Sequence, residues 1–337
     1  MTTAAAAVTV TVTVTVTVAV IAIGRNEGAR LRACLTSLQG QAGRIVYVDS
    51  GSTDDSVAFA RGIGAQVVAL DRSVPFTAAR ARNAGFEALR ADGLPELVQF
   101  VDGDCAIEPG WISAAAATLD SDPTLGIVTG WRTEIAPEAS VYNALAEVEW
   151  HRPAGDIPSC GGDMMVRAAL FDRLGGFNPR IIASEDEEFC LRVRAAGLRI
   201  HRLPRIMTRH DAAMTRFGQW WRRTVRSGHG FAEVGGMFPG HFRPERRRVW
   251  IYGGIVPLML LAGLVTGTWP LVAAAPAIWA LNWARTLQGL LRHGQPLPQA
   301  AHHAVLLTLS KLPNMLGMLT YYLRRARGSD MTIIEYK

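Results

Sequence analysis

The sequence contains little charge and little cysteine. Only 19% of its 337 residues are charged, against roughly 25% in an ordinary soluble protein, and 49% are hydrophobic. This composition excludes a disordered chain and favours contact with a membrane. The four cysteines, Cys34, Cys105, Cys160 and Cys190, lie far apart and form no C-x-x-C pair. That spacing argues against a disulfide framework or a structural zinc site, and it indicates a reducing compartment.

The motifs of two nucleotide-binding classes are also absent. No G-x-G-x-x-G follows the first predicted strand, which argues against a dinucleotide-dependent oxidoreductase. The turn at residues 24–27 is too short for the glycine-rich, lysine-containing phosphate loop of a nucleotidyltransferase. A nucleotidyltransferase therefore stands only as a weaker alternative.

The positive charge is unevenly distributed. The formal net charge is +6, but residues 243–337 hold 11 Lys or Arg against 3 Asp or Glu, and the remainder holds 24 against 26. A basic excess confined to one hydrophobic part suits anionic lipid head groups. It does not form the general basic face that a nucleic-acid partner requires, so we expect none.

Residues 1–15 form a low-complexity extension dominated by a Val-Thr repeat. It lacks the basic start and continuous apolar core of a signal peptide. Strands and helices alternate after it. Strands are predicted at 16–23, 44–48, 65–70 and 97–101, with helices ending near residue 38 and covering 55–62 and 78–91. This order predicts an α/β fold with a mostly parallel sheet covered by helices on both faces.

Polar residues follow three of these predicted strands. Asn26, Asp49 and the pair Asp102 and Asp104 stand where the strands end. Ligands bind beyond the carboxyl ends of parallel strands, so we expect these residues to meet at one site. Two carboxylates separated by Gly103 suit Mg²⁺ or Mn²⁺ bridging a diphosphate.

The last third of the chain is different. No charged residue occurs at positions 249–284, which is 36 residues where about 20 suffice to cross a membrane. A turn at 267–270 predicts a hairpin of helices at 249–266 and 271–283, with a buried soluble pair as the alternative. A third segment, 299–323, contains Lys311 and Pro313, and the three arginines at 324–327 favour a segment that does not span the membrane. We therefore expect a catalytic domain at 16–242 and a membrane-associated helical region at 243–337.

Arginines flank the predicted hairpin on both sides. Four arginines occur at 243–248, directly before it, and Arg285 and Arg292 follow it. By the positive-inside rule both ends of the hairpin lie in the cytoplasm. The sequence thus predicts an inner-membrane protein whose catalytic domain faces the cytoplasm.

Four consecutive acids, residues 185–188, begin another predicted helix. The positive end of the helix dipole alone accounts for two of them. Together with the earlier motifs they carry a resemblance. Residues 22–27 (AIGRNE), 48–55 (VDSGSTDD), 79–85 (ARARNAG), 102–104 (DGD), 160–167 (CGGDMMVR), 174–177 (LGGF) and 185–186 (ED) resemble a family 2 glycosyltransferase with the GT-A fold. The resemblance covers roughly residues 18–230.

The resemblance implies an inverting, metal-dependent transfer of a sugar. The donor would be a nucleotide-diphosphate sugar, usually UDP-linked, and the acceptor a hydroxyl of a lipid-linked molecule or a polysaccharide, with Mn²⁺ or Mg²⁺ as cofactor. The implied base is Asp186, with Glu185 beside it. The implied metal ligands are Asp104, Asp102 and His210. The implied donor-binding residues are Asn26, Glu27, Asp49, Arg82, Asp102, Gly161, Gly162 and Arg222.

Several of these assignments have alternatives. Arg82 could be a surface arginine of its helix, and His210 could be structural. The stretch 219–223 (QWWRR) resembles the Q-x-x-R-W motif of processive members, but Arg223 replaces the tryptophan, which favours transfer of a single sugar. The same stretch could be an amphipathic helix at the membrane surface. A non-catalytic sugar-nucleotide-binding scaffold is the second functional class.

Overall fold

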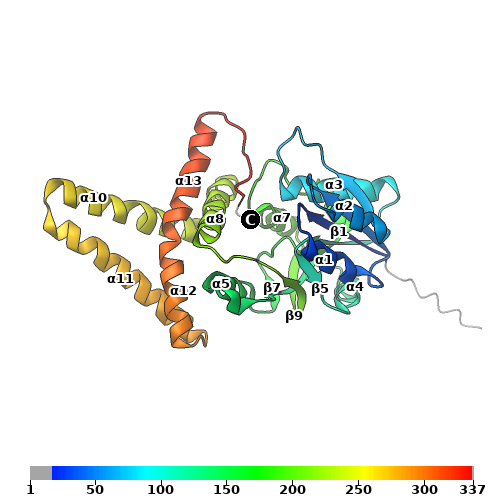
Figure 1. Cartoon of the computed structure of the whole chain (residues 1–337), viewed down its shortest axis with the longest axis horizontal. Helices are drawn as coiled ribbons and strands as arrows, with labels where there is room; N and C mark the ends of the chain where they lie inside the picture. The colour runs from blue at the N-terminus through cyan, green and yellow to red at the C-terminus, as the bar shows by residue number, and fades with distance from the viewer. Residues whose placement is uncertain (1–16, 336–337) are drawn as a thin grey trace, which may run out of the picture.

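The computed structural model describes residues 17–335. The extension at 1–15 and the first residue of the predicted strand at 16–23 lie outside the described residues. An α/β domain forms one side of the molecule in Figure 1, and helices α10 to α13 form the other.

Half of the central sheet is parallel, as predicted. Its strands run in the order β3-β2-β1-β4 and pair in parallel. They are β1 (Val18–Gly24), β2 (Arg44–Asp49), β3 (Gln66–Ala69) and β4 (Leu97–Asp102). Their register brings Gly24 beside Asp49 and Ile23 beside Asp102, so three strands end at the same edge.

The sheet continues with strands that the sequence pattern did not predict. The order after β4 is β8-β6-β9-β5, with β7 paired to β9. These strands are β5 (Cys105–Ile107), β6 (Leu125–Glu134), β7 (Gly155–Ile157), β8 (Met164–Arg167) and β9 (Arg199–His210). Strand β8 is antiparallel to both neighbours, whereas β6 and β9 are parallel to each other.

Helices cover both faces of the sheet. In β1, Ile21 and Ile23 belong to one hydrophobic core and Val20 and Ala22 to the other, because successive side chains of a strand point to opposite faces. The first core contains α3 (Ala78–Ala91), α6 (Ala168–Arg173) and α7 (Glu185–Ala195). The second contains α1 (Ala29–Leu38), α2 (Ser56–Gly62) and α4 (Trp111–Ser121). The predicted α/β class is confirmed.

The predicted hairpin is present, with a longer second helix. Helix α9 (Arg243–Val249) continues through a π-helical turn (Trp250–Ile255) into α10 (Val256–Thr266), and α11 (Trp269–Arg292) packs back along it. The hairpin projects from the body in Figure 1. Among the described residues, one helix, Arg243–Thr266, has the length and composition of a membrane span. The predicted hairpin has two helices, and one of them meets these criteria for a membrane span.

The third segment, predicted at 299–323, is divided into two helices. Two helices form there, α12 (Leu297–Leu309) and α13 (Lys311–Ala326), and they join at Ser310. A proline ring clashes with the carbonyl four residues earlier in a continuous helix, so Pro313 accounts for a break next to Leu309. Helix α13 packs against α8 (Phe217–Met237), and Met318 and Tyr321 are buried there.

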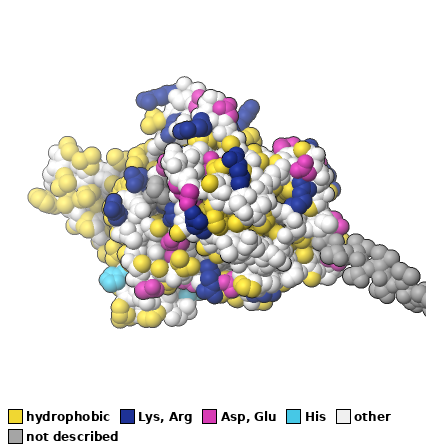
Figure 2. Space-filling model, turned by 45° about the vertical axis from the view of Figure 1, so that its right-hand side comes forward, with side chains coloured by type: hydrophobic (Ala, Val, Ile, Leu, Met, Phe, Trp, Pro, Cys, Tyr) yellow, Lys and Arg dark blue, Asp and Glu magenta, His cyan; other side chains and the backbone are white. Residues whose placement is uncertain are grey.

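The hairpin exposes apolar side chains. Leu258, Leu261 and Leu264 are each more than half exposed, and Val265 is 78% exposed. Yellow hydrophobic side chains cover the corresponding lobe at the left of Figure 2. The domain boundary at residue 242 stays a prediction. Helix α8 precedes this boundary and so belongs to the predicted catalytic domain, although it packs against α13 of the C-terminal region.

Candidate active site

A cavity of about 500 Å³ opens at the carboxyl ends of β1 and β4. Many parts of the chain line it, among them the loop after β1, the start of α3, the turn after β4, the start of α7, the end of β9 and one face of α8. Of the residues proposed from the sequence, Glu27, Arg82, Asp102, Asp104, Gly161, Gly162, Glu185, Asp186 and His210 line this cavity. The structure thus brings together side chains that are up to 183 positions apart in the sequence.

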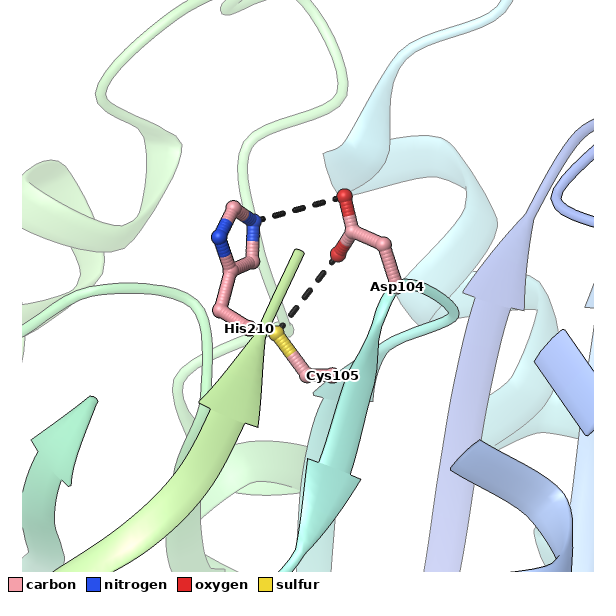
Figure 3. A group of neighbouring side chains, drawn as sticks. All are labelled: Asp104, Cys105 and His210. Carbon is pink, nitrogen blue, oxygen red and sulfur yellow. Dashed lines mark hydrogen bonds and ion pairs between the residues drawn. The ribbon is translucent and has the colours of Figure 1, made fainter. Parts of the chain in front are cut away.

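Asp104 and His210 face each other across neighbouring strands. Asp104 ends the turn before β5, and His210 is the last residue of β9, which pairs with β5. Figure 3 shows the imidazole and the carboxylate pointing toward each other, with Nε2 of His210 3.4 Å from Oδ2 of Asp104. Two ligands at right angles on an ion with bonds of about 2.1 Å lie roughly 3 Å apart. The spacing of this pair therefore fits one divalent cation.

The surroundings of His210 keep its ring oriented and neutral. Nδ1 lies 3.4 Å from Oε2 of Glu134, a carboxylate on the other side of the ring from Asp104. The ring of Trp150, in α5 (Val141–Trp150), packs edge-on at 4.6 Å. Burial lowers the pKa of His210, and Arg132 lowers it further, while Glu134 acts in the opposite direction. A neutral imidazole held by a second carboxylate is the usual form of a histidine metal ligand.

Cys105 lies beside this pair but differs from it in chemistry. Its Sγ is 3.5 Å from Oδ1 of Asp104. Burial raises the pKa of Cys105 well above its ordinary value, so the thiol keeps its proton at neutral pH. Metal-binding cysteines are thiolates. The remaining candidate metal ligands are therefore the carboxylate oxygens of Asp104 and the imidazole nitrogen of His210.

Arg82 is buried rather than on the surface, so the alternative of a surface arginine is wrong. Its Nη2 donates to Oδ1 of Asp102 at 2.6 Å, and its Nη1 donates to Oε1 of Glu185 at 2.6 Å. Burial alone would raise the pKa of Asp102, but Arg82 and Arg132 hold it below its ordinary value. Asp102 is thus a carboxylate engaged by two guanidinium groups, which makes it a poorer metal ligand than Asp104.

Asp186 occupies the second position of α7. Ser184, just before the helix, has a positive φ of 64°, which non-glycine residues adopt rarely. Burial, together with the neighbouring carboxylates Glu185 and Glu187, raises the pKa of Asp186 to about 7. One of its oxygens accepts a hydrogen bond from the backbone N–H of Glu187. A carboxyl group with this pKa is well matched to accept a proton near neutral pH.

The sequence reasoning did not identify Arg132. This residue of β6 lines the cavity, and its Nη2 lies 2.7 Å from Oδ2 of Asp163 and 3.3 Å from Oδ2 of Asp102. Asp163 also accepts a hydrogen bond from the backbone N–H of Asp102. The signal in the sequence was Asp163 itself, within the motif at 160–167. A buried carboxylate requires a cationic partner.

Asn26 and Asp49 do not line the cavity. The Asn26 side chain accepts a hydrogen bond from the backbone N–H of Thr53 at 2.7 Å. The Asp49 carboxylate accepts bonds from the N–H groups of Gly51 and Ser52. Both side chains hold the loop after β2, whose Ser50 reaches the cavity. Their direct contact with a donor stays a prediction.

The assignment of Arg222 needs a correction. Arg222 is exposed and lies outside the cavity, whereas Arg223, Arg226 and Ser227 line it. Adjacent residues of a helix point about 100° apart. Trp220 and Thr224 are buried on one side of α8, so the packing of that side turns Arg223 toward the cavity.

The end of the described chain reaches the cavity as well. After α13 the chain returns to the α/β domain, and Ile333 and Glu335 join the lining. Oε1 of Glu335 lies 2.6 Å from Nη2 of Arg25, in the loop after β1. Figure 1 shows this segment descending from α13 to a point beside α7.

Part of the chain matches a known family of enzymes. Residues 19–162 match the sequence model of Glycosyl transferase family 2. This part of the chain is therefore similar to a family 2 glycosyltransferase. Pre-mycofactocin glycosyltransferases from two strains of Mycobacterium tuberculosis are each 26% identical over 272 residues, covering 75% of this chain and 54% of the relative. The chain thus spans about half the length of these curated relatives.

Two solved structures resemble the whole chain in fold. The mannosyltransferase PcManGT from Pyrobaculum calidifontis has a TM-score of 0.55 at 20% identity, covering 93% of this chain and 88% of its own. Residues 1–349 of TarS from S. aureus have a TM-score of 0.50 at 17% identity, covering 93% and 92%. At these identities the likeness shows the fold alone, and this is the GT-A fold that the motifs implied.

Proposed function

We propose that this chain transfers a sugar from a nucleotide-diphosphate sugar to a hydroxyl group of an acceptor, with inversion at the anomeric carbon. The observation that carries the proposal is a single cavity lined both by the pair Asp104 and His210 and by Asp186. Inversion needs one in-line attack, and thus one base and one site for the leaving diphosphate. The relative PcManGT is described in complex with GDP-Man and Mn²⁺, which supports a donor of this class.

Each group then has one task. Asp186 takes the proton from the acceptor hydroxyl as the acceptor oxygen attacks the anomeric carbon. The bond from that carbon to the diphosphate oxygen breaks, and its electron pair leaves with the nucleoside diphosphate. Arg82, held between Asp102 and Glu185, fixes the acidic end of α7 against β4. Such fixed placement of the reacting groups supplies much of the rate enhancement.

Asp104 and His210 would hold the divalent cation, Mn²⁺ or Mg²⁺. A cation bound there neutralises charge on the departing diphosphate. Asp102, which the sequence also suggested as a ligand, would contribute instead through its contacts with Arg82 and Arg132. Arg223 and Arg226, on the facing surface of α8, would contact the phosphates.

We also propose that the hairpin of α10 and α11 anchors the chain in the inner membrane, with the family 2 domain in the cytoplasm. The apolar stretch of Arg243–Thr266 is long enough to span, and only 17% of its most apolar window is buried. Four arginines at 243–248 precede it. An anchored domain is kept close to a lipid-linked acceptor, which raises the effective concentration of that substrate.

The decisive experiment is a thermal-shift screen of the full chain in detergent with nucleotide sugars, with and without Mn²⁺. A ligand that binds only the folded state raises its stability. We expect a Mn²⁺-dependent shift with UDP-linked donors, and GDP-linked donors are included as the second arm. Absence of any nucleotide-dependent shift would remove the proposed donor class. A non-catalytic scaffold would bind the donor without consuming it, and measurement of nucleoside diphosphate release separates the two.

A further inference from the structure

A second cavity lies between the family 2 domain and the C-terminal helices. It measures about 820 Å³ and shares Gly161, Ser184 and Asp186 with the donor cavity. From these shared residues it reaches Arg248 of α9 and Lys311 of α13. The proposed base therefore lies on the lining of both cavities.

The charges lining this cavity are unevenly matched. Three basic side chains have acidic partners: Arg132 with Asp163 at 2.7 Å, Arg223 with Glu149 at 3.1 Å and His241 with Glu187 at 2.8 Å. Arg248 and Lys311 differ from these. Within residues 17–335, no carboxylate oxygen lies within 4.0 Å of either, and the Lys311 ammonium donates to the Ser310 hydroxyl at 3.0 Å.

Arg248 and Lys311 also act on each other. Burial and the positive charge of Arg248 together lower the pKa of Lys311 to about 8, while Glu149 and Glu245 oppose the change. Backbone packing fixes their elements together. An added Cβ at Gly253 in the π-helical turn would lie 2.8 Å from the carbonyl carbon of Lys311. Two cations on the lining of one cavity favour an anion between them.

A neighbouring polar group is likewise without a partner. Asn314, one turn after Lys311 in α13, lines the same cavity and is 5% exposed. Its Oδ1 makes no hydrogen bond within the described part of the chain. A buried polar atom without a partner is costly, and it is commonly satisfied by a ligand or by water.

We propose that this second cavity receives the acceptor, and that Arg248 and Lys311 bind a phosphate group carried by it. The inference rests on the proposed function, since it assigns Asp186 as the base for a hydroxyl of the same acceptor. Guanidinium and ammonium groups together recognise phosphate through a planar fork and a point charge. The phosphate serves as an anchor, and the nucleophile is the hydroxyl at the other end of the cavity.

The position of Arg248 indicates that the phosphate is borne by a lipid. Arg248 is the last charged residue before 36 uncharged positions, so it lies at the level of lipid head groups if the hairpin inserts. Leu306 and Leu307 of α12 provide apolar lining on the same side as Lys311. A lipid phosphate could thus enter laterally, with its head group between Arg248 and Lys311.

The test uses the full chain in phosphatidylcholine nanodiscs at pH 7, with farnesyl phosphate, farnesol and inorganic phosphate as probes. Binding of each is measured for the wild type, for Arg248→Gln/Lys311→Gln and for Arg247→Gln/Arg327→Gln. The last variant is the matched control, because Arg247 and Arg327 are exposed and do not line the cavity. We expect wild type to prefer farnesyl phosphate over farnesol at least 10-fold. The preference disappears in the first variant and persists in the control.

Equal binding of the phosphate and the alcohol by wild type, or a preference lost equally in the control, would overturn the proposal. If inorganic phosphate competes as well as farnesyl phosphate does, the conclusion that a lipid bears the phosphate is overturned. The anion site at Arg248 and Lys311 is supported by that result. If the double variant does not fold, the single variant Arg248→Gln takes its place, because Arg248 is exposed. This variant is expected to reduce the preference for farnesyl phosphate over farnesol at least 3-fold. Arg248→Lys is expected to retain it.

Failure of the proposed function gives a different result. The Mn²⁺-dependent binding of UDP is measured on the same nanodiscs, and we expect it to be unchanged in Arg248→Gln/Lys311→Gln. Loss of the phosphate preference with intact UDP binding supports both proposals. A wild-type chain that binds no nucleotide but prefers farnesyl phosphate removes the proposed function, and with it the role of this cavity as an acceptor site.

Discussion

The side chain of Arg82 occupies the space that a Cβ at Gly162 would need. An added Cβ there would lie 2.6 Å from Cζ of Arg82 and would overlap its terminal nitrogen. Arg82 is 3% exposed and joins Asp102 to Glu185. The glycine thus permits the buried cation to reach both carboxylates.

Gly162→Ala should displace Arg82 and loosen α7 from β4. Overpacking of this kind costs roughly 1–3 kcal/mol of unfolding free energy. We expect a lower melting temperature and at least a 10-fold loss of turnover. Gly161→Ala is the control, because its nearest neighbour, Oδ2 of Asp186, is 3.9 Å away. Equal effects of the two substitutions would show that the clash with Arg82 is not the cause.

The rate of transfer should fall as the pH drops through about 7. Asp186 acts as a base only when deprotonated, and its pKa is raised to about 7 by burial and by Glu185. Below that pKa the active fraction falls about 10-fold per pH unit. A profile of kcat against pH from 5 to 9, recorded at a saturating donor concentration, measures this decrease as the acidic limb of the profile. A rate that stays constant down to pH 5 contradicts Asp186 as the titrating base.

Glu185→Gln offers a test of the cause of this shift. Removing the Glu185 charge lowers the pKa of Asp186, because that carboxylate raises it and the freed Arg82 lowers it. The acidic limb should therefore move to lower pH, even if the maximal rate also drops. A limb that moves to higher pH argues against this coupling.

The strands of the first half of the sheet and helix α3 could be predicted because their signals are local. The alternation of predicted strands and helices placed a helix at 78–91, where α3 is observed. Arg132 could not be predicted in this way. Its partner Asp163 meets it only because β6 and β8 pair, which depends on contacts distant in sequence. Arg222 was predicted to bind the donor, whereas Arg223 lines the cavity. The sequence could not distinguish them, because the packing of α8 decides which face of the helix meets the cavity.

Asp104→Asn and His210→Ala should each weaken Mn²⁺-dependent binding of UDP at least 10-fold. Both would remove a donor atom from a pair separated by 3.4 Å. Chelation of the metal from wild type with EDTA should produce a similar loss. Cys105→Ala is the control, and we expect affinity within about 3-fold of wild type because its thiol is protonated. Calorimetric titration with UDP measures the affinity of the two variants, of the EDTA-treated wild type and of the control. A larger loss of affinity in Cys105→Ala than in His210→Ala would assign Cys105 as the metal ligand in place of His210.

Glu335→Gln should strengthen nucleotide binding. Glu335 lines the donor cavity and pairs with Arg25 at 2.6 Å, so its charge opposes an incoming diphosphate. Both side chains are exposed, and such pairs contribute at most about 1 kcal/mol to stability. We therefore expect a tighter Kd for UDP and an unchanged melting temperature. Asp330→Asn, in the same segment but outside the cavity, serves as the control. Weaker UDP binding in Glu335→Gln would mean that the segment helps to hold the donor.

Replacing apolar side chains on the hairpin should release the chain from membranes without unfolding it. Leu258, Leu261 and Leu264 are each more than half exposed, so their substitution by Gln removes few contacts within the protein. A polar side chain in a spanning helix opposes insertion, because hydrocarbon cannot solvate it. We expect the triple variant to leave the floating fraction in liposome flotation while it keeps its UDP-induced thermal shift.

The matched control for this variant lies on the α/β domain. Val74, Leu94 and Ile135 are 46%, 39% and 53% exposed, and their triple substitution by Gln removes a comparable set of apolar side chains from the surface. Flotation should not change in that variant, because no lipid contact is expected there. If both triple variants float equally well, the hairpin does not anchor the chain. In that case the exposed leucines of α10 must be covered by another surface, and the 820 Å³ cavity would open toward that surface instead of lipid.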